Sequence, residues 1–113
     1  MKKLLWFSRH EMSPDQSADL TRIFGEVEIT QISKTINSAY DLKAEIEAAD
    51  IIAIVAPINI QQQFLKLSAD KPVITATSER ILTKSDDGSE GKVVFQFKNW
   101  QRLIKIEVVT EIL

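Results

Sequence analysis

The apolar run Ile51-Ile52-Ala53-Ile54-Val55-Ala56 constrains the fold more than any other part of the chain. It follows Asp50, ends at Pro57, and is far shorter than the roughly 20 residues that a membrane-spanning helix needs. A continuous apolar segment rich in β-branched residues is typical of a strand inside a parallel sheet, because both faces of such a strand are covered. The run therefore predicts an α/β fold.

Strand and helix signals alternate along the first two thirds of the chain. A helix is expected to begin at the capping motif Ser13-Pro14-Asp15-Gln16 and to stop at Gly25. The full expected order is strand Lys3–Phe7, helix Ser13–Gly25, strand Val27–Ile32, a helix capped by Ser38, the apolar strand, helix Gln61–Leu67 and strand Val73–Ala76.

This alternation predicts a parallel sheet with right-handed crossovers and helices on both faces. The two most apolar strands, Lys3–Phe7 and the run 51–56, are expected side by side at its centre, which gives the strand order 2-1-3-4. The length of 113 residues predicts one α/β domain over residues 1–113.

The last third changes to an antiparallel β pattern. A hairpin is expected from strands Ile81–Lys84 and Lys92–Phe97 around the loop Ser85–Gly91. A tight turn near Asn99-Trp100 is then expected to lead into a strand over Leu103–Val109, where apolar and charged residues alternate. The sequence thus predicts a C-terminal antiparallel β extension.

Exposed apolar side chains predict a homodimer. The expected hairpin strand Lys92–Phe97 alternates Val and Phe, and Trp6 and Trp100 are costly to leave in water. A contact between two copies covers such groups.

Composition excludes several classes of site and location. The chain has no cysteine and one histidine, so thiolate chemistry and cysteine or His-rich metal sites are excluded within one chain. A net charge of −2 argues against binding duplex DNA. The apolar stretch Leu4–Phe7 is too short for a signal peptide, so a cytoplasmic protein with no membrane contact is expected.

Neither a cofactor nor a metal is expected from the strand ends. No glycine follows the first strand, which disfavours a dinucleotide cofactor or a P-loop nucleotide. No pair of carboxylates follows the parallel strands, which disfavours phosphoryl transfer on magnesium.

Polar residues follow the two central strands where a ligand is expected. In an open parallel sheet, ligands bind beyond the carboxyl ends of the strands, where the strand order reverses. Ser8, Arg9 and His10 come after the first strand, and Asn59 and Gln62 come after the third. These five residues form the predicted site.

Each of these residues also has a purely structural interpretation. Ser8 can simply turn the chain, and Arg9 and His10 can be solvated loop residues. Asn59 can be only the N-cap of the third helix, with Gln62 at its third position.

The residue types point to phosphodiester chemistry. Arginine, hydroxyl groups, amides and helix N-termini bind phosphate oxygens, so Ser8, Arg9, Asn59 and Gln62 are the predicted ligand-binding residues. A ribose 2′-hydroxyl aligned with its neighbouring phosphorus reacts without metal. In that reaction Arg9 would stabilise the phosphorane charge and His10 would act as acid or base, so these two are the candidate catalytic residues.

The strand ends Ser8-Arg9-His10 and Pro57-Ile58-Asn59-Ile60 resemble those of small CRISPR-associated Rossmann-like (CARF-like) proteins that bind or degrade cyclic oligoadenylate. The helix start Met12–Gln16 resembles that of another branch of this family. The similarity covers roughly residues 3–65, and residues 80–113 do not match. The chain also looks like small proteins encoded in phage-like genomic regions.

The resemblance implies a Rossmann-like fold and a cyclic oligonucleotide held between two subunits in antiviral defence. It implies Ser8, Arg9 and His10 at the phosphates and ribose, and Asn59 at a base or ribose edge. Three functions remain open: a metal-independent ring nuclease, a non-catalytic protein that binds or sequesters the nucleotide, and a protein-interaction module with no small ligand.

Overall fold

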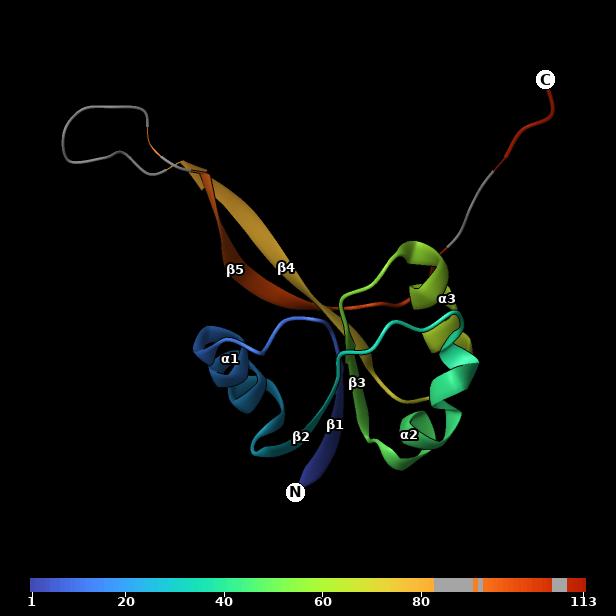
Figure 1. Cartoon of the computed structure of the whole chain (residues 1–113), viewed down its shortest axis with the longest axis horizontal. Coiled ribbons are helices and arrows are strands. Elements are labelled where there is room, and N and C mark those ends of the chain that lie inside the picture. The colour runs from blue at the N-terminus through green and yellow to red at the C-terminus, as the bar shows by residue number, and fades with distance from the viewer. Residues whose placement is uncertain (83–90, 92, 107–109) are drawn as a thin grey trace.

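The computed structural model describes residues 1–82, 91, 93–106 and 110–113. Its elements are β1 Lys2–Phe7, α1 Pro14–Phe24, β2 Val27–Ile32, the 3-10 helix η1 Ala39–Leu42, α2 Lys43–Ala48, β3 Ile51–Ile54, α3 Ile58–Leu67, β4 Val73–Leu82 and β5 Val93–Arg102. They form one mostly parallel sheet flanked by helices (Figure 1), and the predicted α/β class is confirmed.

The sheet has five strands in the order β2-β1-β3-β4-β5. The first four are parallel, and β5 pairs antiparallel with β4. This order differs from the expected four-strand order because the C-terminal antiparallel strand joins the same sheet beside β4 and extends its edge.

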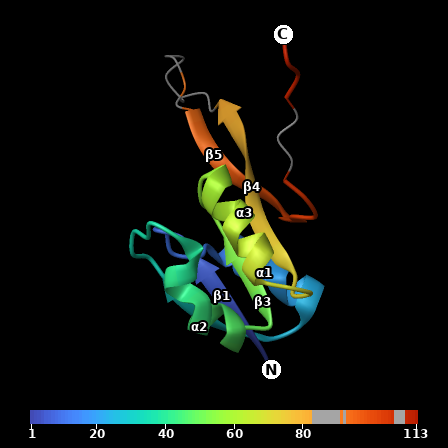
Figure 2. The ribbon, with the colours of Figure 1, turned by 90° about the vertical axis from the view of Figure 1, so that its right-hand side faces the viewer.

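The side chains of β1 alternate between two apolar layers. Leu4 and Trp6 pack towards α1, and Leu5 and Phe7 pack towards η1, α2 and α3. Figure 2 shows α2 and α3 on one face of the sheet with α1 behind it. Because β1 and β3 are covered on both faces, Ile51 through Ile54 are all buried, as predicted. The strand ends two residues earlier than the apolar run, and Val55 is 45% exposed.

Local signals at the helix ends are confirmed. The Ser13 hydroxyl accepts from the Gln16 backbone N–H, and the Gln16 side chain accepts from the Ser13 backbone N–H, which is a complete capping box. Gly25 ends α1 with a positive φ of 78°. Ser38 caps η1, which continues into α2 and buries Leu42 and Ile46.

The third helix starts earlier than predicted. It begins at Ile58 rather than Gln61, and its N-cap is Pro57, so the interpretation of Asn59 as the N-cap is wrong. Proline suits a helix start, because its φ is already near the helical value. It has no N–H, and a backbone N–H at the start of a helix has no intrahelical acceptor in any case.

The C-terminal third differs most from the prediction. The expected strands Val73–Ala76 and Ile81–Lys84 belong to one strand, β4, and residues 83 and 84 lie outside the described residues, as does most of the expected loop. No turn occurs at Asn99-Trp100, because β5 runs through both residues to Arg102.

The expected last strand is absent from the described residues after β5. Residues 103–106 are irregular, and 107–109 lie outside the described residues.

A β-bulge interrupts the pairing of β5 with β4. Thr77 opposes Asn99 and Ser78 opposes Phe97, so Lys98 is an extra residue on β5. Beyond the bulge, residues 78–82 and 93–97 form a two-stranded arm whose outer part extends past the helices (Figure 1). The Cα radius of gyration is 16.7 Å, against about 13 Å for a compact domain of this length.

Both tryptophans are buried within the chain. Trp6 is 2% exposed and Trp100 is 9% exposed, and they contact each other beneath α1. The part of the dimer prediction that relied on exposed tryptophans is therefore wrong.

No helix in the described part of the chain is both long enough and apolar enough to span a bilayer.

Candidate functional site

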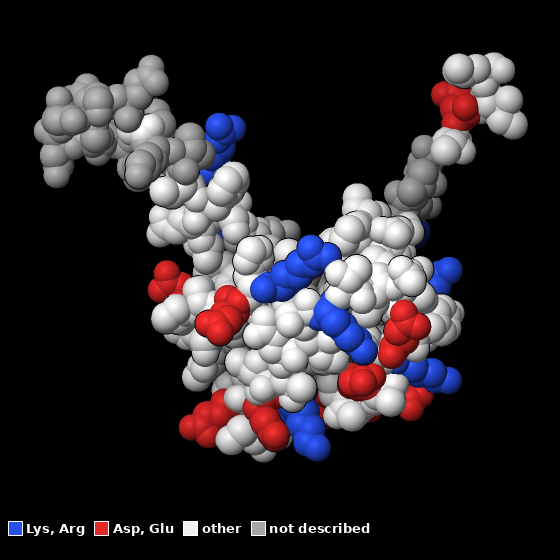
Figure 3. All heavy atoms as spheres, in the orientation of Figure 1, with Lys and Arg blue, Asp and Glu red and all other residues white. Residues whose placement is uncertain are grey.

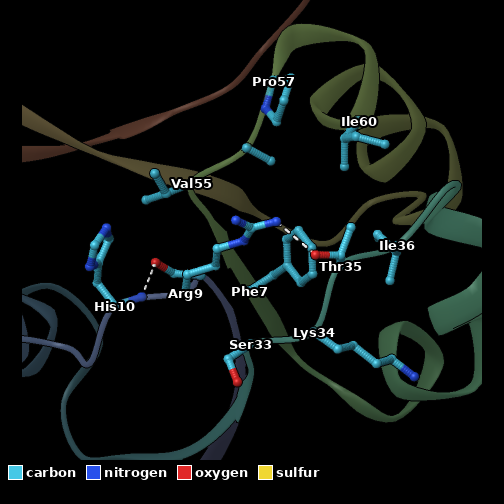
Figure 4. A pocket seen from close by; sticks show the side chains of 12 residues that line it. Phe7, Arg9, His10, Ser33, Lys34, Thr35, Ile36, Val55, Pro57 and Ile60 are labelled. Atoms are coloured by element: carbon cyan, nitrogen blue, oxygen red, sulfur yellow. Dashed lines mark hydrogen bonds between the residues drawn. The ribbon is translucent and has the colours of Figure 1, made fainter.

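A cleft of about 440 Å³ lies beyond the carboxyl ends of β1 and β3, where the sequence placed the site. This volume falls in the range of small-molecule pockets. Figure 4 shows its lining, which comes from the loops after β1, β2 and β3 and from the start of α3. The lining residues are Phe7, Ser8, Arg9, His10, Ser33, Lys34, Thr35, Ile36, Val55, Ala56, Pro57 and Ile60.

Ser8 is buried and forms the turn that follows β1. Its hydroxyl oxygen accepts from the His10 backbone N–H at 3.1 Å, and its carbonyl accepts from Gln31 Nε2 at 3.1 Å. The turning role considered for Ser8 is therefore present, and Ser8 is also one of the residues that line the cleft.

His10 is held by its backbone. Its carbonyl oxygen accepts from Trp6 Nε1 at 3.0 Å and from Gln31 Nε2 at 3.0 Å. The imidazole is exposed, and in Figure 4 it points away from the guanidinium of Arg9. The loop is thus fastened to the buried indole of β1 and to β2, and the two predicted catalytic side chains diverge.

Arg9 reaches across the cleft towards the loop after β2. Its Nη2 donates to Thr35 Oγ1 at 2.7 Å (Figure 4), and the side chain remains exposed. A guanidinium held in this way keeps other N–H groups free to meet an anion, because arginine carries five donors.

The loop after β2 contributes residues that the sequence analysis missed, namely Ser33, Lys34, Thr35 and Ile36. A signal for them was present. β2 runs parallel to β1 in the register Lys2–Val27 through Phe7–Ile32, so its carboxyl end reaches the same edge of the sheet.

Asn59 and Gln62 do not line the cleft. Asn59 is exposed on the first turn of α3, and Gln62 borders a separate hollow with Leu65, Lys66 and residues 104–106. Because α3 starts three residues early, Ile60 is the α3 side chain that lines the cleft. Gln61 Nε2 donates to the Ala56 carbonyl at 3.0 Å and fastens the turn before the helix.

The lining combines an apolar wall with cations. Phe7, Ile36, Val55, Pro57 and Ile60 supply apolar surface, and Val55 is 45% exposed at the rim. The charged lining residues are Arg9 and Lys34, with no carboxylate among the lining residues, and the Lys34 side chain extends away from Arg9 in Figure 4. Such a site favours a ligand with an anionic group and an apolar ring system.

Among the described residues, no three His, Asp or Glu side chains lie together in a way that could hold a metal ion. None of the protein-family models, curated proteins and solved structures compared with this chain matches it.

Proposed function

We propose that the cleft binds the phosphodiester group of a nucleotide, and that the nucleotide is a cyclic oligonucleotide of the cyclic oligoadenylate type. The observation that carries the proposal is the position of Arg9, which crosses the cleft to Thr35 and faces an apolar wall with no carboxylate in the lining. The guanidinium supplies the donors that a phosphate oxygen needs, and Phe7, Ile60 and Pro57 supply apolar surface for a base.

The choice of a cyclic oligonucleotide rests on the strand ends. Ser8-Arg9-His10 resembles the strand end of the CARF-like proteins, and all three residues line the cleft. Asn59, the residue expected at a base or ribose edge, is not among the residues that line the cleft. Base contacts are therefore assigned to the apolar wall instead, and this predicts binding with limited discrimination between bases.

Binding is supported better than cleavage. Metal-free cleavage by a ribose 2′-hydroxyl needs charge stabilisation and proton transfer at the same phosphorus. Arg9 extends to Thr35 while the His10 ring points to the other side, so the two groups do not converge (Figure 4). A non-catalytic protein that sequesters its ligand is therefore the primary proposal, and the metal-independent ring nuclease is the alternative.

Isothermal titration with cyclic tri-, tetra- and hexa-adenylate tests the proposal, with adenosine as the uncharged probe. We expect at least one ring to bind and adenosine not to bind. Arg9→Ala should weaken binding by roughly 10- to 100-fold, because a hydrogen bond to a charged group contributes about 1.5–3 kcal/mol. The melting temperature should change little, since Arg9 is exposed.

The matched control is Arg22→Ala. Arg22 is also an exposed arginine with one side-chain partner, Asp19, but it lies on α1 outside the cleft lining. Its removal should leave ligand affinity unchanged. An equal loss of affinity in both variants would mean that Arg9 contributes only its positive charge and makes no specific contact with the ligand. No binding of any ring by the wild-type protein would reject this function and favour the protein-interaction module.

A further inference from the structure

Among the described strands, β5 has a neighbour on one side only, and its outer part lies in the arm. β3 pairs with β4 only at Val73 and Ile74, so most of β4 has β5 as its one neighbour among the described strands. The outer part of the arm extends past the body in the space-filling view as well (Figure 3). A two-stranded ribbon without further cover is at best marginally stable, so this arm is expected to gain stability from a partner.

An apolar stripe runs out along the arm. The rings of Phe97 and Trp100 lie 5.8 Å apart in the core beneath α1. The bulge at Lys98 brings these two residues, three apart in the chain, to one face. Phe95 continues the stripe beyond the helix, and its side chain is 76% exposed.

The outer part of β5 lacks the charges that β2 and the outer part of β4 contain. Charged residues on an edge strand discourage pairing with another chain. β2, at the opposite edge, contains Glu28, and the β4 side of the arm contains Glu79 and Arg80. The segment Val94–Phe97, which we term the outer β5 segment, contains no charge, and Lys98 at the bulge marks its end.

We propose that the outer β5 segment pairs antiparallel with the same segment of a second copy of this chain, with the two-fold axis at Phe95. Directly opposed residues of antiparallel strands share a face, so a symmetric pair must be centred on a residue. Centring on Phe95 places the two Phe95 rings together, and each Val94 opposes the partner's Gln96. In this register the pairs at the axis, Phe95 with Phe95 and Val94 with Gln96, carry no charge, and Lys98 lies three residues from the axis.

This interface has two physical consequences. It satisfies the open backbone groups of both edges at once and joins two five-stranded sheets into one. It also covers both Phe95 side chains, which are among the most exposed large apolar groups in the described helices and strands. No residue of β5 lines the cleft, so the proposal is independent of what the cleft binds.

Sedimentation velocity without nucleotide gives the first test. We expect the wild-type protein to dimerise reversibly in the micromolar range and Phe95→Lys to stay monomeric, because two like charges would then meet at the axis. Tyr40→Lys is the matched control, since Tyr40 is also a large exposed side chain (61% exposed) but lies on η1, outside the arm. It should dimerise like the wild type, and circular dichroism confirms that both variants fold.

Cysteine scanning gives the register, and the chain is suited to it because it has no native cysteine. Phe95→Cys should oxidise to a covalent dimer, since directly opposed Cβ atoms lie about 4.5–5.5 Å apart, close to disulfide range. Gln96→Cys alone should not form a disulfide, because the two substituted side chains would lie two residues apart along the paired strands instead of opposite each other. A mixture of Val94→Cys and Gln96→Cys should form a mixed disulfide.

The outcomes separate this proposal from a dimer formed over the cleft. A wild-type protein that stays monomeric at all concentrations overturns it. So does a Phe95→Lys variant that still dimerises, or a dimer that forms only after nucleotide is added. Equal oxidation of Phe95→Cys and Gln96→Cys overturns the register centred on Phe95.

Discussion

The indole rings of Trp6 and Trp100 meet edge to face, with centroids 5.6 Å apart and planes inclined by 80°. Each indole N–H also donates to a backbone carbonyl at 3.0 Å, that of His10 for Trp6 and that of Gln16 for Trp100. One aromatic pair therefore connects β1, β5, α1 and the segment between β1 and α1. Because this segment begins with the loop that carries Arg9, core packing and cleft geometry are linked.

Substituting Trp6 with Phe should affect both stability and ligand binding. The variant loses the bond to the His10 carbonyl and leaves a partly empty space under α1, which should lower the free energy of unfolding by about 1–3 kcal/mol. Chemical denaturation measures this change. Trp100→Phe is the control, because it loses a similar bond to Gln16 and should destabilise the protein without changing ligand affinity. Equal affinity changes in the two variants would contradict the proposed link between Trp6 and the cleft.

Gln31 should act on binding more than on stability. Its Nε2 bridges the carbonyls of Ser8 and His10 from the exposed side chain of an edge strand. Gln31→Leu removes both bonds and should weaken nucleotide binding about three- to tenfold, the effect of a neutral hydrogen bond or two. Titration calorimetry measures this loss, and Thr30→Val on the same strand is the control. A Gln31→Leu variant that binds as tightly as the wild type shows that the loop keeps its shape without this side chain.

Thr35 should position Arg9 rather than bind the ligand strongly itself. Thr35→Val keeps the shape of the side chain but removes the hydroxyl that accepts from the guanidinium. We expect a smaller loss of affinity than in Arg9→Ala, and almost no further loss when the two substitutions are combined. A double-mutant cycle measures this coupling. Additive losses would mean that the two residues act separately on the ligand.

The nucleotide should be recovered intact after incubation with the protein in EDTA, since the Arg9 and His10 side chains diverge (Figure 4). The nuclease alternative predicts a different result. The ring should then open without metal, leave a 2′,3′-cyclic phosphate or 3′-phosphate end, and open about 10²–10⁴-fold more slowly in His10→Ala. Chromatography of the products separates the two outcomes. Cleavage that requires added magnesium or manganese would contradict both.

Ala69→Gly should stabilise the protein. Ala69 follows α3 with a φ of 52°, in the left-handed region that a side chain makes unfavourable. Glycine removes this strain, and the free energy of unfolding should rise by up to about 1 kcal/mol. Ala18→Gly, in the exposed interior of α1, is the matched control and should lower stability by about 1 kcal/mol. Destabilisation at both positions would show that chain entropy outweighs the strain at Ala69.

Local features of the fold could be predicted from the sequence because they depend on near neighbours. The capping box of Ser13 and Gln16 and the stop at Gly25 involve residues within one or two helical turns. The burial of Ile51–Ile54 followed from composition, since such a run has no polar face to expose. The site at Ser8, Arg9 and His10 followed from strand polarity, because parallel strands end at one edge.

Tertiary structure decided what depends on distant residues. The bulge at Lys98 exists only in the pairing of β5 with β4, so the sequence pattern suggested a turn where the strand continues. Thr35 meets Arg9 across 26 positions of the chain. Asn59 and Gln62 lie outside the cleft lining, because the packing of Ile60 and Phe64 into the core fixes which face of α3 turns towards the cleft. The packing of the whole sheet determines strand register and the start of a helix. Helix caps and the burial of an apolar run depend only on residues close together in the sequence.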